Sequence, residues 1–163
     1  MNTSIVKTHK GQTIMIQHDV SDTRPYSRIH MIQGTKGVAR TYPLPSRISE
    51  GNKWVDDEKM KELVAKYTPE IVQKVGEMTK ESGHGGMDFI MAWRLIDCLR
   101  NGLPLDQDVY DAALWSSLSP LSEWSVAHRS NSIDVPDFTC GSWETNTPVN
   151  LTLEGGGTTK MRR

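Results

Sequence analysis

Apolar and polar residues alternate along the first third of the chain, as they do in β-strands. In "TIMIQHDV" (residues 13–20), Ile14, Ile16 and His18 fall on one face of a predicted half-buried strand. Two further short strands are predicted within "SRIHMIQGTKGVARTYP" (residues 27–43), where "QGTKG" forms the turn and offers a glycine for positive φ at either end. "THKG" (residues 8–11) predicts an earlier hairpin turn. Short strands joined by tight turns favour an antiparallel meander.

The pattern becomes helical after residue 55. "YPLPSRISEGNKWV" (residues 42–55) is predicted to be a loop because it carries prolines and a glycine. "DDEKMKELVAKY" (residues 56–67) predicts a helix whose acidic first turn complements the helix dipole. "PEIVQKVGEMTKES" (residues 69–82) predicts a second helix, with Pro69 as its first residue and Thr68 as its cap.

The strongest helical pattern begins at Met87. Apolar residues recur there near the 3.6-residue period, at Met87, Ile90, Met91, Leu95, Cys98 and Leu99. Asn101, Gly102 and Pro104 are predicted to end this helix. Residues 108–130 predict another long helix, with Pro120 inside it as the place for a kink. A meander followed by helices predicts an α+β fold in which the helices cover one face of the sheet.

Composition narrows the classes of function. The chain has 163 residues, enough for one domain with a core, and a formal net charge of −1. A charge so close to zero gives no reason to expect a nucleic acid or a membrane surface as partner. Two cysteines are too few for a disulfide framework, and we interpret Cys98 as a buried free thiol. No signal peptide is recognisable at the start of the chain.

The first candidate site is "SGHGGMD" (residues 82–88). Glycines on both sides of His84 remove side chains, so a ligand or another stretch of backbone can approach. Asp88 stands near a predicted helix start, where it either caps the helix or orients the imidazole and sets its tautomer. The alternative is that the glycines serve only sharp turns and His84 binds a loop carbonyl.

The second candidate is "HDVSDTRPYSR" (residues 18–28). Arg24 and Arg28 have the chemistry to bind anionic or hydroxyl-rich groups. Tyr26 follows a proline on stiffened backbone and is able to present its phenol to a pocket. The alternative is an ordinary polar loop with the tyrosine lying over the core.

Other chemistry-bearing residues have simpler interpretations. Asp106, Asp108 and Asp111 lie at a predicted helix start, where the helix dipole explains them, and we predict no metal site. Trp115 and Trp124 are interpreted as packing residues. Neither a nucleophile–base pair nor a phosphate-binding glycine motif is recognisable, so the residues alone do not indicate an independent enzyme.

Three segments together resemble a known family: "QHDVSDTRPYSRIHMIQGTKG", the run from "GHGGMD" through "PLDQDVYDAA" to "SVAHRS", and "VPDFTCGSW". They are similar to the C-terminal half of glycoside hydrolase family 109, within the Gfo/Idh/MocA superfamily of NAD-dependent oxidoreductase-like proteins. The resemblance covers residues 3–143, nearly the whole chain.

The resemblance implies an open-faced, largely antiparallel sheet, and an N-terminal Rossmann domain that holds NAD outside this chain. It implies α-N-acetylgalactosaminidase-type chemistry by transient oxidation: NAD takes a hydride from C3, the leaving group is eliminated from the ketone, water adds and the hydride returns. This route dispenses with the usual pair of carboxylates, and the cofactor carries the difficult step.

The resemblance also assigns residues. Tyr26 matches a position where the family places a substrate-contacting tyrosine, and Arg24 is its neighbour. His84 and Asp88 match a loop near the mouth of the pocket. We expect residues 1–145 to form the substrate-side domain and residues 146–163 a C-terminal tail. The chain alone is expected to be inactive, because the cofactor and the proton-transfer residues belong to the other domain.

The expected partners are a sugar, the Rossmann domain and a second copy of the chain in a homo-oligomer. Two alternatives remain open: a domain of an NAD-dependent sugar dehydrogenase, or a stand-alone oligomerisation or binding module. The sequence does not decide between bacterial cytoplasm and periplasm.

Overall fold

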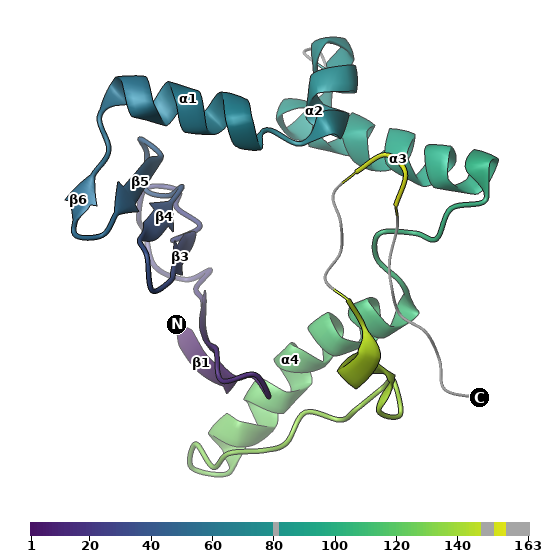
Figure 1. Ribbon diagram of the computed structural model, residues 1–163. Helices are drawn as coiled ribbons and strands as arrows, with labels where there is room; N and C mark the ends of the chain where they lie inside the picture. The colour runs from purple at the N-terminus through teal and green to yellow at the C-terminus, as the bar shows by residue number, and fades with distance from the viewer. Residues whose placement is uncertain (80–81, 148–151, 156–163) are drawn as a thin grey trace. The chain divides into compact units, whose positions relative to one another are not determined.

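The computed structural model describes residues 1–79, 82–147 and 152–155, and it divides the chain into two compact units, Met1–Tyr67 and Thr68–Arg163. The first unit holds the strands and one helix, and the second holds the remaining helices (Figure 1). Antiparallel sheets followed by helices confirm the predicted α+β class. Part of the predicted tail over residues 146–163 lies outside the described residues.

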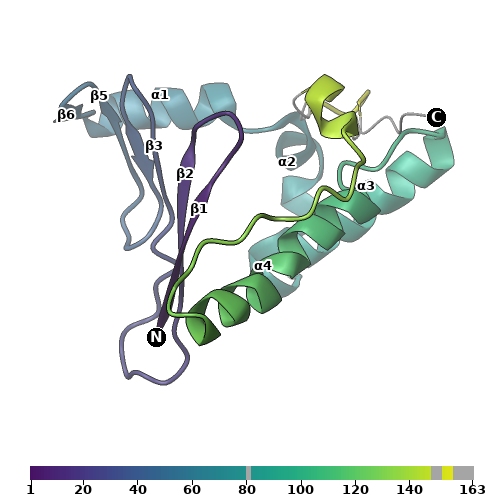
Figure 2. The same ribbon diagram turned by 90° about the horizontal axis from the view of Figure 1, so that it is seen from below.

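The chain begins with an antiparallel hairpin of β1 (Asn2–Lys7) and β2 (Thr13–His18), whose two strands run side by side in Figure 2. The predicted turn is confirmed, since the N–H of Gly11 donates to the carbonyl of Thr8 at 3.0 Å. The predicted half-buried face is less covered than expected: Ile16 is half-buried, while Ile14 and His18 are exposed.

Four short strands form the second sheet: β3 (Met31–Gln33), β4 (Val38–Arg40), β5 (Arg47–Glu50) and β6 (Lys53–Trp54), in that order and all antiparallel. The first two confirm the predicted pair. The predicted loop over residues 42–55 is wrong, because it contains β5 and β6, which turn about Gly51. Strands of four and two residues are too short to show an alternation of apolar and polar residues, and the prolines and glycine around them indicate a loop.

Gly37 in the β3–β4 turn has a different role from the one predicted. Neither Gly34 nor Gly37 takes a positive φ. A Cβ on Gly37 would instead lie 2.0 Å from the carbonyl oxygen of Ser49. Glycine is therefore required here because β5 approaches the turn closely.

Helix α1 (Asp57–Tyr67) completes the first unit and confirms the prediction for that segment. In the second unit, α2 (Glu70–Val75) continues into a short 3₁₀ segment, η1 (Gly76–Thr79). This helix is shorter than predicted, and its cap position is held by Pro69 rather than Thr68. Proline suits that position because it has no N–H to leave unpaired.

The main helices are α3 (Met87–Asn101) and α4 (Val109–Ala127), and both were predicted. Gly102 ends α3 in the left-handed conformation with φ 64°. A second 3₁₀ segment, η2 (Gly83–Gly86), leads into α3, and η3 (Ser142–Thr145) follows α4.

The core of the second unit is small and lies where α2 and η1 pack on α3. Val75 and Cys98 are buried there, which confirms Cys98 as a buried free thiol. Burial raises the pKa of that thiol, because the apolar surroundings disfavour the thiolate.

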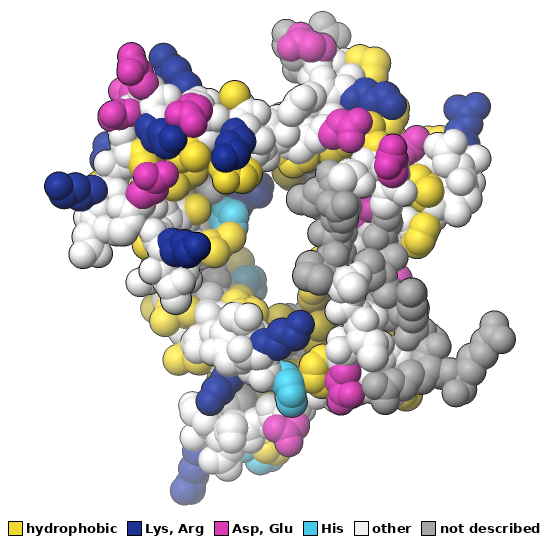
Figure 3. Space-filling model, viewed as in Figure 1, with side chains coloured by type: hydrophobic (Ala, Val, Ile, Leu, Met, Phe, Trp, Pro, Cys, Tyr) yellow, Lys and Arg dark blue, Asp and Glu magenta, His cyan; other side chains and the backbone are white. Residues whose placement is uncertain are grey.

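The other face of α3 is not covered by the described residues. Met87, Met91, Leu95 and Leu99, four residues apart, form a stripe that stays exposed in the described structure. Trp115 and Trp124 on α4 are likewise exposed, contrary to the packing role predicted, and Trp124 stacks on His128 with ring centroids 4.0 Å apart. Hydrophobic side chains lie on the surface beside charged ones (Figure 3). No helix in the described part is long and apolar enough to span a bilayer.

Candidate functional site

Tyr26 lies in a cluster with Arg28 and Tyr42 in the first unit. The Arg28 Nε–H donates to the Tyr26 hydroxyl oxygen at 2.6 Å. The Arg28 guanidinium also lies 5.9 Å from the ring centre of Tyr26 and 5.8 Å from that of Tyr42. The two rings meet edge to face, with centroids 5.9 Å apart and planes at 87°. An arginine shared by two aromatic rings is fixed in place more firmly than a lone surface arginine.

The β3–β4 hairpin brings the two tyrosines together. Met31 pairs with Arg40, and the pairing continues where the N–H of Thr41 donates to the carbonyl of His30 at 2.9 Å. The chain entering β3 and the chain leaving β4 therefore run side by side, and Tyr26 and Tyr42 lie on these two segments. Tyr26 remains 73% exposed, so the ring is open to a ligand.

The structure gives the predicted loop residues different surroundings. Arg24, which we predicted as the neighbour in the site, makes no hydrogen bond or ion pair with the described residues, and it is exposed. Arg28 is the arginine that contacts the phenol, and this contact raises the pKa of its guanidinium. Nothing in the sequence indicated Tyr42 as a residue of this cluster except its position just after β4. Whether Arg24 and Tyr26 touch a substrate stays a prediction.

His84 and Asp88 form the second cluster, in the second unit. His84 Nδ1 lies 2.9 Å from Asp88 Oδ2, and α3 has no side-chain cap. Of the two roles left open for Asp88, the structure therefore shows the orienting one. In a neutral imidazole whose Nδ1–H donates to this carboxylate, Nε2 is left as an acceptor. Both side chains are more than half exposed, so the pair adds little stability and mainly orients the ring.

The surrounding glycines allow this arrangement. His84, Gly85 and Gly86 have φ of 52°, 67° and 95°. Glycine adopts this left-handed conformation more easily than any other residue. A Cβ on Gly83 would lie 2.7 Å from Asp88 Oδ2, so a side chain there would displace the carboxylate. A Cβ on Gly86 would lie 2.4 Å from the Thr79 hydroxyl. The glycines thus serve both the turn and the His84–Asp88 contact.

A separate polar cluster surrounds Arg94 on α3. Its guanidinium binds both oxygens of Asp106, at 2.9 and 3.1 Å, and Asp97 at 2.9 Å. It also donates to the carbonyls of Thr152, Leu153 and Gly155. The Asp106 carboxylate is the main reason that the pKa of Arg94 is raised. Arg94 is 8% exposed, so these partners compensate for burying its charge.

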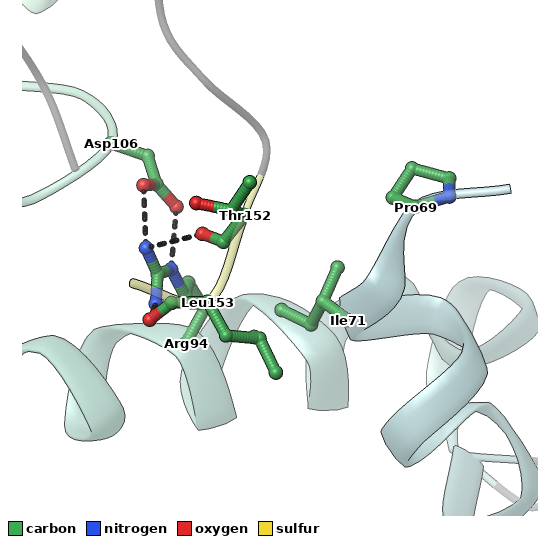
Figure 4. Close-up of a pocket in the computed structure, with 6 residues that line it drawn as sticks. All are labelled: Pro69, Ile71, Arg94, Asp106, Thr152 and Leu153. Carbon is green, nitrogen blue, oxygen red and sulfur yellow. Dashed lines mark hydrogen bonds and ion pairs between the residues drawn. The ribbon is translucent and has the colours of Figure 1, made fainter. Parts of the chain in front are cut away.

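A cavity of about 90 Å³ lies beside Arg94 and is shown in Figure 4, lined by Pro69, Ile71, Arg94, Asp106, Thr152 and Leu153. The guanidinium donors are already directed at carboxylates and carbonyls, so none is left for an anionic ligand. This cluster holds the segment Thr152–Gly155 to α3 rather than binding a substrate.

The predicted carboxylate cluster at the start of α4 has structural roles. Asp108 caps α4 by accepting from the N–H groups of Tyr110 and Asp111, and Asp111 returns a bond to the N–H of Asp108. Asp106 is committed to Arg94. The part of the chain that the structure describes has no group of three His, Cys, Asp or Glu side chains able to hold a metal.

Comparison with known proteins identifies the chain's family. The model of the family described as "Glycosyl hydrolase 109, C-terminal domain" matches residues 1–145. A glycosyl hydrolase family 109 protein of Shewanella amazonensis is 51% identical over 159 residues, which is 93% of this chain and 34% of that relative. Glycosyl hydrolase family 109 protein 2 of Shewanella sp. strain ANA-3 is 50% identical, with the same coverage of 93% and 34%.

The chain spans about a third of the length of these relatives. Matches of this extent and identity do not arise between unrelated domains. The chain therefore belongs to glycosyl hydrolase family 109 and carries its C-terminal domain.

Proposed function

We propose that this chain is the substrate-side domain of an NAD-dependent glycosidase acting on α-N-acetylgalactosaminide-type sugars. The observation that carries the proposal is the family match over residues 1–145. Tyr26, Arg24, His84 and Asp88 are its substrate-side residues. The Tyr26 phenol and the Arg24 guanidinium bind sugar oxygens, while His84 offers Nε2 as an acceptor for a sugar hydroxyl.

The "GHGG" turn at the start of α3 does not fit NAD. A dinucleotide-binding turn joins a strand to a helix and leaves the helix N-terminus open for the pyrophosphate. Here the "GHGG" turn is preceded by the 3₁₀ segment η1, and the first turn of α3 carries Asp88, whose charge would repel a phosphate. We propose that NAD, which supplies the transient oxidation in the proposed reaction, is held by an N-terminal Rossmann domain.

The exposed apolar side chains on α3 and α4 support the proposal that this domain works in contact with other domains or subunits. We propose the Rossmann domain and a second copy of the chain as the partners that cover them. A stand-alone binding module would expose similar faces. The two alternatives differ in activity, because only an enzyme domain would restore turnover when it is joined to the N-terminal part of a family 109 protein.

The first test measures the chain by itself. Calorimetric titration of the purified chain with NAD is expected to show no saturable binding, because the "GHGG" turn does not fit the pyrophosphate. Saturable binding would place the cofactor site in this chain and contradict the proposed division between the domains.

The second test joins the chain to the first two thirds of the Shewanella amazonensis relative, in place of that protein's own C-terminal domain. The joined protein is expected to release p-nitrophenol from p-nitrophenyl α-N-acetylgalactosaminide without net formation of NADH. The relative rejoined to its own domain at the same junction is the control. Net NADH from the free sugar would indicate a dehydrogenase, and no turnover beside an active control would contradict the proposal.

A further inference from the structure

We propose that Arg28 is a positioning residue that makes Tyr26 a hydrogen-bond donor toward the sugar, with Tyr42 holding Arg28 in place. This inference rests on the proposed function, since it assumes that Tyr26 contacts the substrate. It adds two residues, Arg28 and Tyr42, and it specifies which kind of sugar atom Tyr26 recognises.

The hydrogen-bonding capacity of the two groups sets the direction. A phenol has one O–H donor and an oxygen that accepts, whereas a guanidinium only donates. At 2.6 Å, the Arg28 Nε–H occupies an acceptor position on the Tyr26 oxygen. The phenol proton cannot point back at Arg28, so it turns to another acceptor. A ligand at the exposed Tyr26 must then offer an oxygen lone pair, such as a hydroxyl, glycosidic or acetamido carbonyl oxygen.

The backbone around Arg28 is built to hold it in this place. Ile29, the next residue, has φ of 45°, which is rare for a β-branched residue and costs conformational energy. Its N–H donates to the Ser27 hydroxyl at 3.1 Å, which closes the turn. Strain of this kind is found where a structure fixes a side chain for function. The turn sends the chain into β3 and leaves Arg28 beside both rings.

Tyr42 approaches Arg28 from the other side. Its ring centre lies 5.8 Å from the Arg28 guanidinium carbon, and its ring is nearly perpendicular to that of Tyr26. Tyr42 is half-buried, whereas Tyr26 is exposed, so Tyr42 is the supporting ring and Tyr26 the one that meets a ligand.

The inference is tested in the joined protein with Tyr26→Phe, Arg28→Met, the double variant and Arg28→Lys. Loss of one hydrogen bond predicts about a tenfold fall in kcat/KM for Tyr26→Phe and three- to tenfold for Arg28→Met. Arg28→Met in the Tyr26→Phe background is expected to change kcat/KM by less than twofold, because the hydroxyl that Arg28 orients is already gone. Arg28→Lys keeps a charged donor and is expected to recover part of the loss. Arg47→Met, another exposed arginine of the first unit, is the control.

A spectroscopic measurement on the full chain checks the contact without turnover. The Arg28 Nε–H is expected to give a slowly exchanging NMR signal that Tyr26→Phe removes and Arg47→Met leaves unchanged. Equal losses from Arg28→Met with and without the Tyr26 hydroxyl would overturn the inference. An active joined protein indifferent to Tyr26→Phe would instead contradict Tyr26 as a substrate contact, and the inference falls with it.

Discussion

At the scale of single residues, the two candidate clusters are held differently: the contact of His84 with Asp88 is local in the sequence, whereas the Tyr26 cluster depends on strand pairing. His84 and Asp88 are four residues apart, and their contact was one of two roles expected for Asp88. Tyr26 and Tyr42 are brought together by the β3–β4 pairing, which a single sequence does not reveal. Arg24 was preferred to Arg28 as the partner of Tyr26, because spacing alone cannot show which side of a turn an arginine takes.

Gly83 provides a test of the orienting role of Asp88. Alanine at this position would place a Cβ 2.7 Å from Asp88 Oδ2, so Gly83→Ala is expected to push the carboxylate away from His84. The imidazole would then lose the partner that fixes the proton on Nδ1, and the other tautomer would appear. Long-range ¹H–¹⁵N NMR of the full chain reports the tautomer directly.

Gly34→Ala is the matched control for that substitution, because its Cβ would meet nothing closer than 4.0 Å and its φ is not positive. It is expected to leave the His84 signals unchanged. A wild-type His84 that already exchanges freely between tautomers at neutral pH would contradict the orienting role.

At the scale of elements, long periodic segments were predicted well. Helices α1, α3 and α4 and the first two hairpins follow from period, caps and turn residues. The missed strands β5 and β6 are too short to carry a pattern. Which face of α3 is covered was not predictable either, because that helix has apolar residues on more than one face and only packing with α2 selects Cys98.

Arg94 also holds α3 in place, through its bonds to Asp106 and to the carbonyl of Leu153. Its replacement tests how much these bonds stabilise the second unit. Arg94→Met would leave Asp97 and Asp106 without their cation. Breaking a buried ion pair in this way costs several kcal/mol, and we expect about 3 kcal/mol because the Asp106 side chain is 32% exposed. Urea unfolding of the full chain measures the loss.

The control is Lys59→Met, which breaks the exposed pair with Glu62 on α1. Surface pairs contribute little, so we expect a change below about 0.5 kcal/mol. Equal effects of the two substitutions would mean that the Arg94 cluster does not stabilise the second unit.

At the scale of the whole molecule, the exposed apolar side chains are the main feature. Met91 is 71% and Leu99 67% exposed on α3, and α4 has no buried residue. A formal net charge of −1 offers little repulsion between copies. The isolated chain is therefore expected to self-associate as its concentration rises, which analytical ultracentrifugation detects.

Charged residues on the α3 stripe are expected to weaken this association. Met91→Lys combined with Leu99→Lys places two like charges on that face, whereas Ala65→Lys on α1 adds a charge elsewhere and serves as the control. A wild-type chain that stays monomeric at every concentration would argue against these faces as contact surfaces.

The Arg94 cluster has a consequence for how this family evolves. Arg94 holds the segment Thr152–Gly155 through main-chain carbonyls, which every amino acid provides. Substitutions in that segment would leave the attachment intact as long as the backbone keeps its course. A comparison of homologous sequences would then show no correlated changes between Arg94 and the residues of Thr152–Gly155. This contact would leave a visible constraint on the arginine and none on the side chains of Thr152–Gly155.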